Sequence, residues 1–496
     1  MATRRDELSA HTFARKRTLA AFLQPESRVS DEDAPRPFRA IMPSVVLSVV
    51  LVVACIAWGV ISPSAPPGWD ETGQYVIVDT DSTTRYVVLP EEGKNGSRNK
   101  QLHPVLNFAS ARLVLDKGKG EVIEVSGQDI DEGGVPRGAT IGIPYAPDRL
   151  PSPEDAGGAK EWAVCEKPGA DSGGEPQQAV FVLGGQDEGA LRDRYRLNDG
   201  QAQYVEDSKT GERYVVDAEG TRLRLDGGEN DANRNLLTKL VLRDPGAPQK
   251  VSTQWLETLN GGEDIRFPTL DVTPGTPPGF SGAEELPEEA QAVGTVLKYT
   301  AAGTDYYYVV RQDRLQYTTP LVAKLFMGGS QLQQRDPVAI TPLQAASAGA
   351  TEEQDSGGKR WPDDVLEPVN RDAQGVDDAA RTVSCSIYTG DISGQGRPVL
   401  ATWSGPEYPA KVVAGSARAY VSPGSGLLFR EVSGRGGGGR KYLLTDSGLR
   451  YALAGEAGAR LGYEKAKVVR VPQNWSAMLP KGPTLSKDSA SQEQGL

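Results

Sequence analysis

One long apolar run stands out in a chain whose other apolar segments are short and separated by polar turns. Residues 40 to 61 are 22 consecutive positions without a charged side chain. A bilayer core is about 30 Å thick and a helix rises about 1.5 Å per residue, so roughly 20 such residues cross it. A secretory signal has a shorter apolar core and begins close to the N-terminus. The pattern therefore predicts a transmembrane helix over residues 40–62.

The flanks of this run predict its orientation. Arg28, Arg36 and Arg39 precede it, whereas the following SPSAPPGWDE contains no basic residue. Basic residues next to a span tend to stay on the cytoplasmic side. We therefore expect a single-pass protein of the cell (inner) membrane, with residues 1–39 in the cytoplasm and the C-terminal domain exported.

The cytoplasmic segment 1–39 is predicted to be basic and amphipathic. In RRDELSAHTFARKRTLAAFLQPE, helical spacing places Leu8, Thr12, Arg15, Leu19 and Phe22 on one side, and residues 15–17 form a basic cluster. Such a helix rests on a membrane surface or docks on a partner protein, and a solvated helix is the alternative. The candidate partner-binding residues are Arg15, Lys16, Arg17, Leu19 and Phe22.

Four exported segments share one pattern of alternating apolar and polar positions. Each has a short strand, a turn rich in Gly, Asp or Ser, a tyrosine within a second strand, and a stretch with helical spacing. A polar turn between two alternating strands is typical of a β-hairpin. The tyrosines are Tyr86, Tyr214, Tyr308 and Tyr442. The pattern predicts four small β-hairpin/helix repeats at residues 72–118, 201–245, 291–330 and 425–482.

The spacing of the repeats indicates an internal duplication. Cys165 follows Tyr86 by 79 residues, and Cys385 follows Tyr308 by 77. Each half of the exported region would then contain a repeat, a cysteine-bearing segment and a second repeat. We therefore predict one central β-domain, assembled from residues 119–200 and 331–424 with pseudo-two-fold symmetry.

The remaining segments complete the predicted architecture. Residues 246–290 are rich in proline and are predicted to be a crossover linker between the halves. Residues 483–496 are predicted to be a disordered tail. The predicted fold class is α+β, mostly β, with one N-terminal transmembrane helix followed by an elongated exported region.

Three cysteines are present, and Cys55 lies inside the apolar run. Cys165 and Cys385 are both in the predicted exported part, where disulfides persist. We therefore predict that they pair, although two separate thiols are the alternative. Closing a loop of this length contributes roughly 5 kcal/mol at most in the chain-entropy model.

The charge balance limits the classes of partner. Residues 1–40 have a net charge of +2 in a chain of net charge −12, which leaves −14 for the rest. An acidic surface of this kind repels phosphate backbones and favours solubility. We therefore expect no nucleic acid among the partners.

The sequence offers little material for catalysis. It contains two histidines, His11 and His103, so neither a zinc site nor a Ser-His-Asp triad can be built from the exported part without other groups. The glycine-rich stretches DKGKGE and GGGGRKY lack the spacing of a Walker A motif. We expect no catalytic residues, no metal and no cofactor, and enzymatic activity is not expected.

Several stretches together resemble one protein family. ELSAHTFARKRTLAAFL, RGATIGIPYAPDRLP, EWAVCEKP and PQNWSAMLPKGPTLS are similar to segments of the EccB family. These proteins are single-span core components of the ESX, or type VII, secretion machinery of actinobacteria, and the resemblance extends from about residue 3 to 487. It implies a membrane complex with EccC, the motor ATPase, and with EccD and EccE, and self-association of the exported domain.

The resemblance and the pattern together predict a structural core subunit. It would scaffold and dimerise the exported face of the secretion complex and couple it to the motor ATPase. A cell-wall (peptidoglycan)-binding anchor is the alternative, because small repeated β-units can present several weak sites. A weakly ATP-hydrolysing subunit is the second alternative, since members of the family are sometimes called ATPases.

Overall fold

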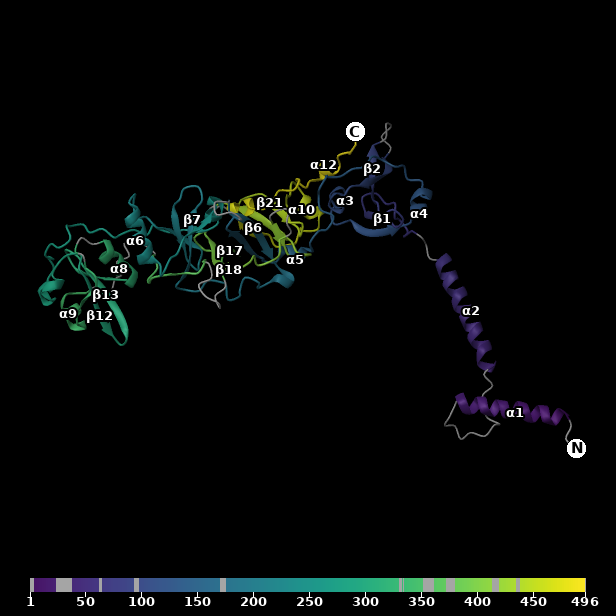
Figure 1. Cartoon of the computed structure of the whole chain (residues 1–496). Helices are drawn as coiled ribbons and strands as arrows, with labels where there is room; N and C mark the ends of the chain where they lie inside the picture. Colours follow the sequence, from purple (N-terminus) through teal and green to yellow (C-terminus); the bar gives the residue numbers. More distant parts are fainter. Residues whose placement is uncertain are drawn as a thin grey trace. The chain divides into compact units, whose positions relative to one another are not determined.

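In the computed structural model the chain consists of two units, Met1–Pro67 and Gly68–Leu496. The structure describes residues 4–23, 38–61, 65–92, 98–169, 175–329, 332, 334–350, 361–371, 380–412, 419–433 and 438–495. The first unit contains two helices, α1 (Arg4–Leu23) and α2 (Phe38–Ile61), and the strands lie in the second unit (Figure 1).

Helix α2 covers the apolar run for which the sequence predicts a transmembrane helix. It is helical over its 24 residues and contains Pro43. In the part of the chain that the structure describes, no helix has the length and hydropathy needed to cross a membrane.

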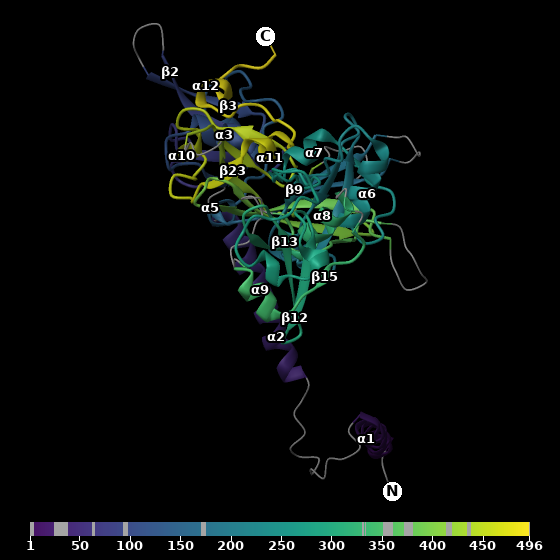
Figure 2. The same cartoon turned by 90° about the vertical axis from the view of Figure 1, so that its left-hand side faces the viewer.

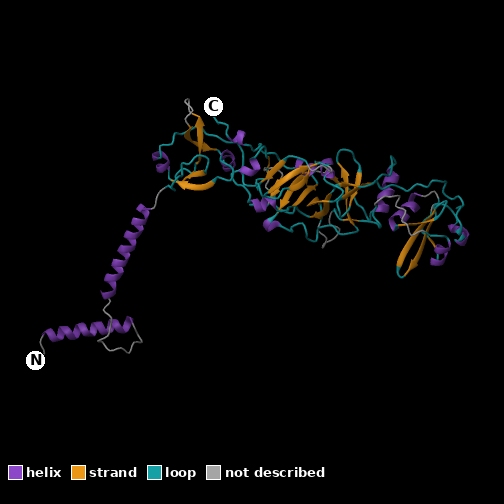
Figure 3. Ribbon diagram, turned by 180° about the vertical axis from the view of Figure 1, so that it is seen from behind, coloured by secondary structure: helices purple, strands orange, loops and turns teal. Residues whose placement is uncertain are grey.

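Strands and loops make up most of the second unit, with short helices between them (Figure 3). Its first sheet begins with an antiparallel meander of β1 (Tyr75–Asp79), β2 (Arg85–Glu92) and β3 (Arg98–Val105). Helix α3 (Phe108–Val114) follows, and β4 (Glu121–Val125) returns parallel to β1. The resulting strand order is β3-β2-β1-β4.

Three further sheets contain the same succession of three antiparallel strands, a helix and a strand parallel to the first. The second sheet has β7 (Gln201–Asp207), β8 (Arg213–Val216), β9 (Thr221–Arg224), α6 (Asp231–Val241) and β10 (Gln249–Val251), and is extended by β11 (Asn260–Gly261) and β16 (Glu367–Pro368). The third has β12 (Val296–Ala301), β13 (Thr304–Val310), β14 (Leu315–Thr318), α8 (Pro320–Gly329) and β15 (Val338–Ala339). The fourth has β20 (Leu427–Val432), β21 (Lys441–Leu444), β22 (Arg450–Ala452), α10 (Ala457–Arg460) and β23 (Val469–Pro472).

The four tyrosines of the sequence pattern occupy equivalent places in these sheets. Each lies on the second strand and pairs with a residue of the first strand. The pairs are Tyr86 with Ile77, Tyr214 with Val205, Tyr308 with Leu297, and Tyr442 with Phe429.

A short helix follows the returning strand of every sheet: α4 (Gly127–Glu132), α7 (Thr253–Glu257), α9 (Pro342–Ser347) and α11 (Gln473–Ala477). The first three begin after a hydroxyl residue, Ser126, Ser252 or Thr341, whose side chain accepts a backbone N–H of the first turn. Such an N-cap satisfies a donor that has no partner within the helix. A serine or threonine after a short strand is therefore the local signal for this element.

A fifth, central sheet combines two distant parts of the chain. Its strands are β5 (Glu161–Lys167), β6 (Gln177–Leu183), β17 (Val383–Ile392), β18 (Pro398–Gly405) and β19 (Ala419–Val421). The order is β18-β17-β5-β6-β19, so the hairpin β5–β6 meets the hairpin β17–β18 along an antiparallel β5–β17 pair. The described residues of this unit also form helix α5 (Pro153–Gly157) and three 3-10 turns (Gly185–Asp187, Ala283–Glu285 and Glu288–Ala290).

Buried clusters join the sheets in the order first, fourth, central, second and third, which differs from their order along the chain. One cluster combines the first and fourth sheets, a second combines the central sheet with the second and fourth, and a third combines the second and third. Helix α12 (Lys487–Ala490), near the C-terminus, lies beside α3 of the first sheet in both views (Figures 1 and 2). The ends of the second unit therefore share a core.

The tail predicted to be disordered is instead folded. It contains α12, and both Leu485 and Ala490 are fully buried in the cluster between the first and fourth sheets. Ser486 caps the helix by accepting the N–H of Ser489. Two apolar contacts and one cap thus hold a segment whose composition alone is that of a tail.

The segment predicted to be a linker, residues 246–290, is ordered over its first part. It contains β10, α7 and β11, and Trp255 of α7 is fully buried. The returning strands β4, β10 and β15 also lie beyond residues 118, 245 and 330, where the sequence pattern ends the predicted repeats. These strands have two to five residues and pair in parallel, so no hairpin turn marks them in the sequence.

Candidate functional site

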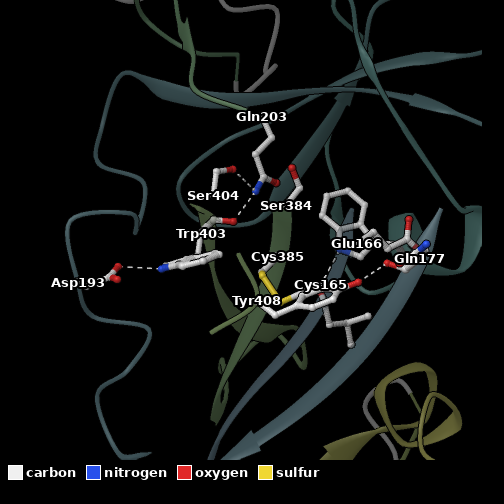
Figure 4. The surroundings of a disulfide bond; sticks show 12 residues. Cys165, Glu166, Gln177, Asp193, Gln203, Ser384, Cys385, Trp403, Ser404 and Tyr408 are labelled. Atoms are coloured by element: carbon white, nitrogen blue, oxygen red, sulfur yellow. Dashed lines mark hydrogen bonds between the residues drawn. A yellow bond between two sulfur atoms is a disulfide. The ribbon is translucent and has the colours of Figure 1, made fainter. Parts of the chain in front are cut away.

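The middle of the central sheet brings together Cys165 and Cys385, the two cysteines of the second unit. Cys165 on β5 lies directly opposite Cys385 on β17, and the two form a disulfide between residues 220 positions apart. Both are fully buried, on a sheet face that also carries Phe181 and Trp403. Figure 4 shows the disulfide beside Tyr408, whose hydroxyl donates to the Gln177 carbonyl at 2.6 Å. A covalent bond therefore joins the two hairpins of this sheet.

The residue after Cys165 carries the most deeply buried carboxylate around this site. Glu166 has no exposed surface and accepts hydrogen bonds from the Ser252 N–H at 2.7 Å and from Gln178 Nε2 at 2.9 Å. Burial raises the pKa of the Glu166 carboxyl, and the hydrogen bonds from Ser252 and Gln178 oppose that shift. Because Ser252 is also the N-cap of α7, Glu166 fixes the start of that helix to the central sheet.

Helix α7 presents Trp255 to the same sheet. The indole is fully buried, and its Nε1 donates to the Val164 carbonyl at 2.9 Å. Helix α11, which follows the fourth sheet, presents Trp475 in the corresponding place. Trp475 is also fully buried, its Nε1 donates to the Thr258 carbonyl at 3.1 Å, and its ring lies 5.7 Å from that of Tyr388 on β17. Two tryptophans thus seat the second and fourth sheets on one face of the central sheet.

Buried amides complete the contact between the central and second sheets. Gln203 of β7 donates through Nε2 to the Trp403 carbonyl at 2.9 Å and to Ser404 Oγ at 3.0 Å (Figure 4). Ser384 of β17 donates to Gln249 Oε1 at 2.8 Å. Hydrogen bonds between buried groups require defined positions, because a displaced donor loses its partner without reaching water. The contact between the central and second sheets is therefore suited to holding the two sheets in a fixed relative position.

The described residues contain no group of His, Cys, Asp and Glu that could hold a metal ion. His103 has its Nδ1 2.9 Å from the Ala139 carbonyl, a contact that holds a loop to β3. In the glycine-rich stretch at Lys119, the backbone N–H of Lys119 donates to the Asp116 carbonyl and closes a turn. These groups support the fold, and nothing in their geometry assembles an acid, a base and a nucleophile.

The predicted partner-binding residues lie on α1, in the first unit. Arg15, Lys16 and Arg17 are exposed, as are Leu19 and Phe22, with 56% and 88% of their surface accessible. Exposed aromatic and aliphatic side chains beside a basic cluster are suited to contact with another surface. The two predicted groups of site residues, on α1 and around the disulfide, therefore belong to separate units.

Sequence reasoning missed Glu166, Ser252 and both tryptophans. A signal for the tryptophans was present, because KVSTQW and RVPQNW share a valine and a tryptophan four positions apart. Each stretch begins within the returning strand, and its tryptophan lies six positions after the first residue of that strand. Glu166 carries no such signal, since an acidic residue beside a cysteine gives no indication of complete burial.

Comparisons with known proteins give one consistent result. The model of the family described as "Type VII secretion system ESX-1, transport TM domain B", or EccB, matches residues 1–496. The chain is 27% identical over 520 residues to the ESX-5 secretion system ATPase EccB5 of Mycobacterium marinum, covering 98% of this chain and 92% of that one. It is 25% identical over 519 residues to the ESX-3 secretion system ATPase EccB3 of Mycolicibacterium smegmatis, covering 98% and 90%.

Solved structures share the fold. A chain of an intact ESX-5 inner membrane complex matches with a TM-score of 0.62 and 24% identity, over 100% of this chain and 96% of that chain. A chain of the EccB3 dimer from the ESX-3 core complex matches with a TM-score of 0.62 and 24% identity, over 84% and 99%.

Proposed function

This chain belongs to the EccB family of the type VII secretion system, and from that premise we propose that it is a structural core subunit of such a secretion complex. In this role its exported part would scaffold and dimerise the outer face of the complex. The chain would also couple that face to the motor ATPase subunit, EccC, and contact EccD and EccE. A relative solved as a dimer and another solved within an inner membrane complex support the proposal.

The observation that carries the proposal is the construction of the central sheet. Its strands come from both halves of the exported region, a disulfide joins them, and two buried tryptophans seat the flanking sheets. Interiors packed in this way transmit displacement with little deformation. A rigid support of this kind is what a scaffold requires.

The proposal includes an internal duplication. Four sheets have the same succession of strands, and the central sheet pairs one hairpin from each half of the chain. We interpret these sheets as four repeats related by a pseudo-two-fold axis near the disulfide. Each half would then exchange its outer sheet with the other half, which agrees with the shared core of the first and fourth sheets.

The first unit would supply the anchor and the cytoplasmic contact. We propose that residues 40–61 lie in the inner membrane in a single pass, because none of them is charged. The N-terminus would be cytoplasmic and the second unit exported. Helix α1 would then dock on other subunits through Arg15, Lys16, Arg17, Leu19 and Phe22.

The experiment is purification of the tagged full chain from its own membranes, followed by native gels and mass spectrometry. We expect EccC-, EccD- and EccE-like proteins to co-purify and to be lost when residues 1–39 are removed. The variant K16E/R17E should lose them as well. Its matched control, R4E/R5E, reverses two charges at the start of the same helix and should keep them. Recovery of the unmodified chain alone would refute the assignment.

Peptidoglycan binding is a second candidate, favoured by one feature of the third sheet. Tyr299, Tyr306 and Tyr317 are half-buried on one face, and the rings of Tyr299 and Tyr306 stack with centroids 4.9 Å apart. Partly exposed aromatic rings are able to pack on sugar rings. The candidate requires the full chain to sediment with insoluble cell wall and the variant Y299A/Y306A to lose that binding.

A further inference from the structure

A cavity of about 650 Å³ opens where the second and third sheets meet. Its lining comes from the end of α6, from α8, from Tyr307 of β13, and from residues 334–337 and 364–365. Ligand-binding cavities typically measure about 300–1,000 Å³, so this one is large enough for a molecule of several residues.

The two helices that border the cavity are held close together. A Cβ added to Gly328 of α8 would lie 2.3 Å from Leu240 Cδ1 of α6, and both residues line the cavity. The backbone of α8 therefore touches the side chains of α6 at this point. On the other side, the Leu366 N–H donates to the Val241 carbonyl and fixes the neighbouring segment to the end of α6. Two packed helices thus form one side of the cavity, and irregular segments form the rest of its lining.

Four basic side chains gather on this lining: Lys239, Arg243, Lys324 and Arg335. All four are exposed, and within the described part of the chain none of them forms a salt bridge. With the three aspartates of the same lining, the cavity has one positive charge in excess, in a chain of net charge −12. Basic side chains that form no salt bridge within the protein are available to pair with anionic side chains of a ligand.

The rest of the lining indicates the kind of anion. Leu240, Tyr307 and Met327 supply apolar surface, whereas Asp244, Asp336 and Asp364 supply carboxylates. Three carboxylates oppose a compact, highly charged group such as free phosphate. A polypeptide spreads its negative charge over several side chains and also offers backbone N–H donors, which carboxylates accept.

We propose that this cavity binds an acidic peptide segment of a partner protein. The basic side chains pair with the Glu and Asp residues of the segment, the carboxylates accept its backbone N–H groups, and its apolar side chains pack on Tyr307 and Met327. The inference goes beyond the scaffold role and does not depend on it, because peptide binding is measurable on the solubilised chain in the absence of other subunits.

The test is fluorescence polarisation with the full chain in detergent and a fluorescein-labelled decapeptide of alternating Glu and Leu. We expect binding that weakens as salt is raised, and a Kd about tenfold lower than for the decapeptide of alternating Gln and Leu. The variant K324E/R335E is expected to raise the Kd about tenfold. The matched control, K209E/K250E, reverses two exposed charges on the second sheet outside the cavity and should bind within about twofold of the unmodified chain.

Each other result overturns the proposal. Equal binding of the Glu and Gln peptides, or equal weakening by the two double variants, would mean that the cavity does not recognise acidic peptide. Displacement of the peptide by excess inorganic phosphate, but not by excess chloride, would identify a phosphate site instead. Displacement by unlabelled copies of this chain would identify a contact between copies.

If K324E/R335E unfolds at a lower temperature than the unmodified chain, the neutral variant K239Q/K324Q replaces it with the same expectation.

Discussion

The two outer junctions of the second unit use similar sheets but are filled differently. Between the first and fourth sheets, a continuous apolar cluster is completed by Leu485 and Ala490 from the C-terminal segment. Between the second and third sheets, a smaller apolar cluster lies next to a cavity lined by seven charged residues. One junction is therefore built for stability, and the other leaves room for a ligand.

The segments that cross the two junctions account for part of this difference. At the first junction the crossing segment forms α12, which packs on α3. At the second junction residues 366–368 form an extended segment, in which Leu366 is bridged to Leu242 and β16 pairs with β7. A helix with its side chains is about 10 Å wide, whereas adjacent strands are about 4.8 Å apart. An extended segment thus covers less of a junction than a helix does.

The largest expected effect concerns the central sheet, which packs against the second and fourth sheets. Replacing both cysteines in C165A/C385A should lower the free energy of unfolding by about 3–5 kcal/mol, because the disulfide closes a loop of 220 residues and its sulfur atoms are fully buried. Urea unfolding of the detergent-solubilised full chain, followed by tryptophan fluorescence, measures this loss. An unchanged midpoint would show that the two hairpins need no covalent link.

The next largest effect concerns the junction between the first and fourth sheets. Leu485→Ala should cost about 2–4 kcal/mol, since a fully buried leucine leaves a void when it is truncated. Leu343→Ala on α9 is the control, because that side chain is 75% exposed and its removal should change stability by less than about 0.5 kcal/mol. Equal midpoints for the two variants would mean that the C-terminal segment is not part of the core in solution.

A smaller effect depends on pH and concerns the second sheet. Burial raises the pKa of Asp217 to about 6, above the value of about 3.9 for an unfolded chain. Protonation therefore favours the folded state, and this contribution is complete below about pH 4 and is lost as the pH rises through about 6. The corresponding turn of the fourth sheet has Thr445, which does not ionise in this range.

Asp217→Asn should therefore stabilise the chain at pH 7 by about 1–2 kcal/mol and leave it unchanged at pH 4. The asparagine keeps the oxygen that accepts the Thr221 N–H at 2.7 Å. Melting temperatures of the variant and of the unmodified chain between pH 4 and 8 measure both the stabilisation at pH 7 and its absence at pH 4. Since the pKa of Glu166 is also raised, the variant should keep some pH dependence in the same direction. Loss of stability at pH 7 would contradict the argument.

The sequence predicted the hairpins because their signals are local. Polar turns between alternating strands mark the strand pairs that carry Tyr86, Tyr214, Tyr308 and Tyr442, and each pair is present. The predicted resemblance to EccB is confirmed by the family match over the whole chain. The interpretation of the sheets as symmetric repeats, and the role of α1, stay proposals.

What the sequence did not predict depends on contacts between distant residues. The strands β10 and β15 have three and two residues and pair in parallel, so neither length nor a turn marks them. Glu166 is a polar residue whose burial is compensated by Ser252, 86 positions later. The charged cavity involves α6, α8 and residues 334–337 and 364–365, which meet only in the folded chain. A pattern read along the chain cannot identify such partners.

The smallest expected effect tests most directly whether the two junctions differ in packing. Leu240→Ala, at the open junction, should cost about 1 kcal/mol, because this side chain is only half-buried and already borders the cavity. The same leucine-to-alanine change at Leu485 should cost at least twice as much, and urea unfolding of both variants gives the ratio. A cost at Leu240 equal to that at Leu485 would mean that the second junction is closed in solution. The cavity proposed to bind an acidic peptide would then have no room for its ligand. The difference between the junctions therefore requires that Leu485→Ala cost more than about twice as much as Leu240→Ala.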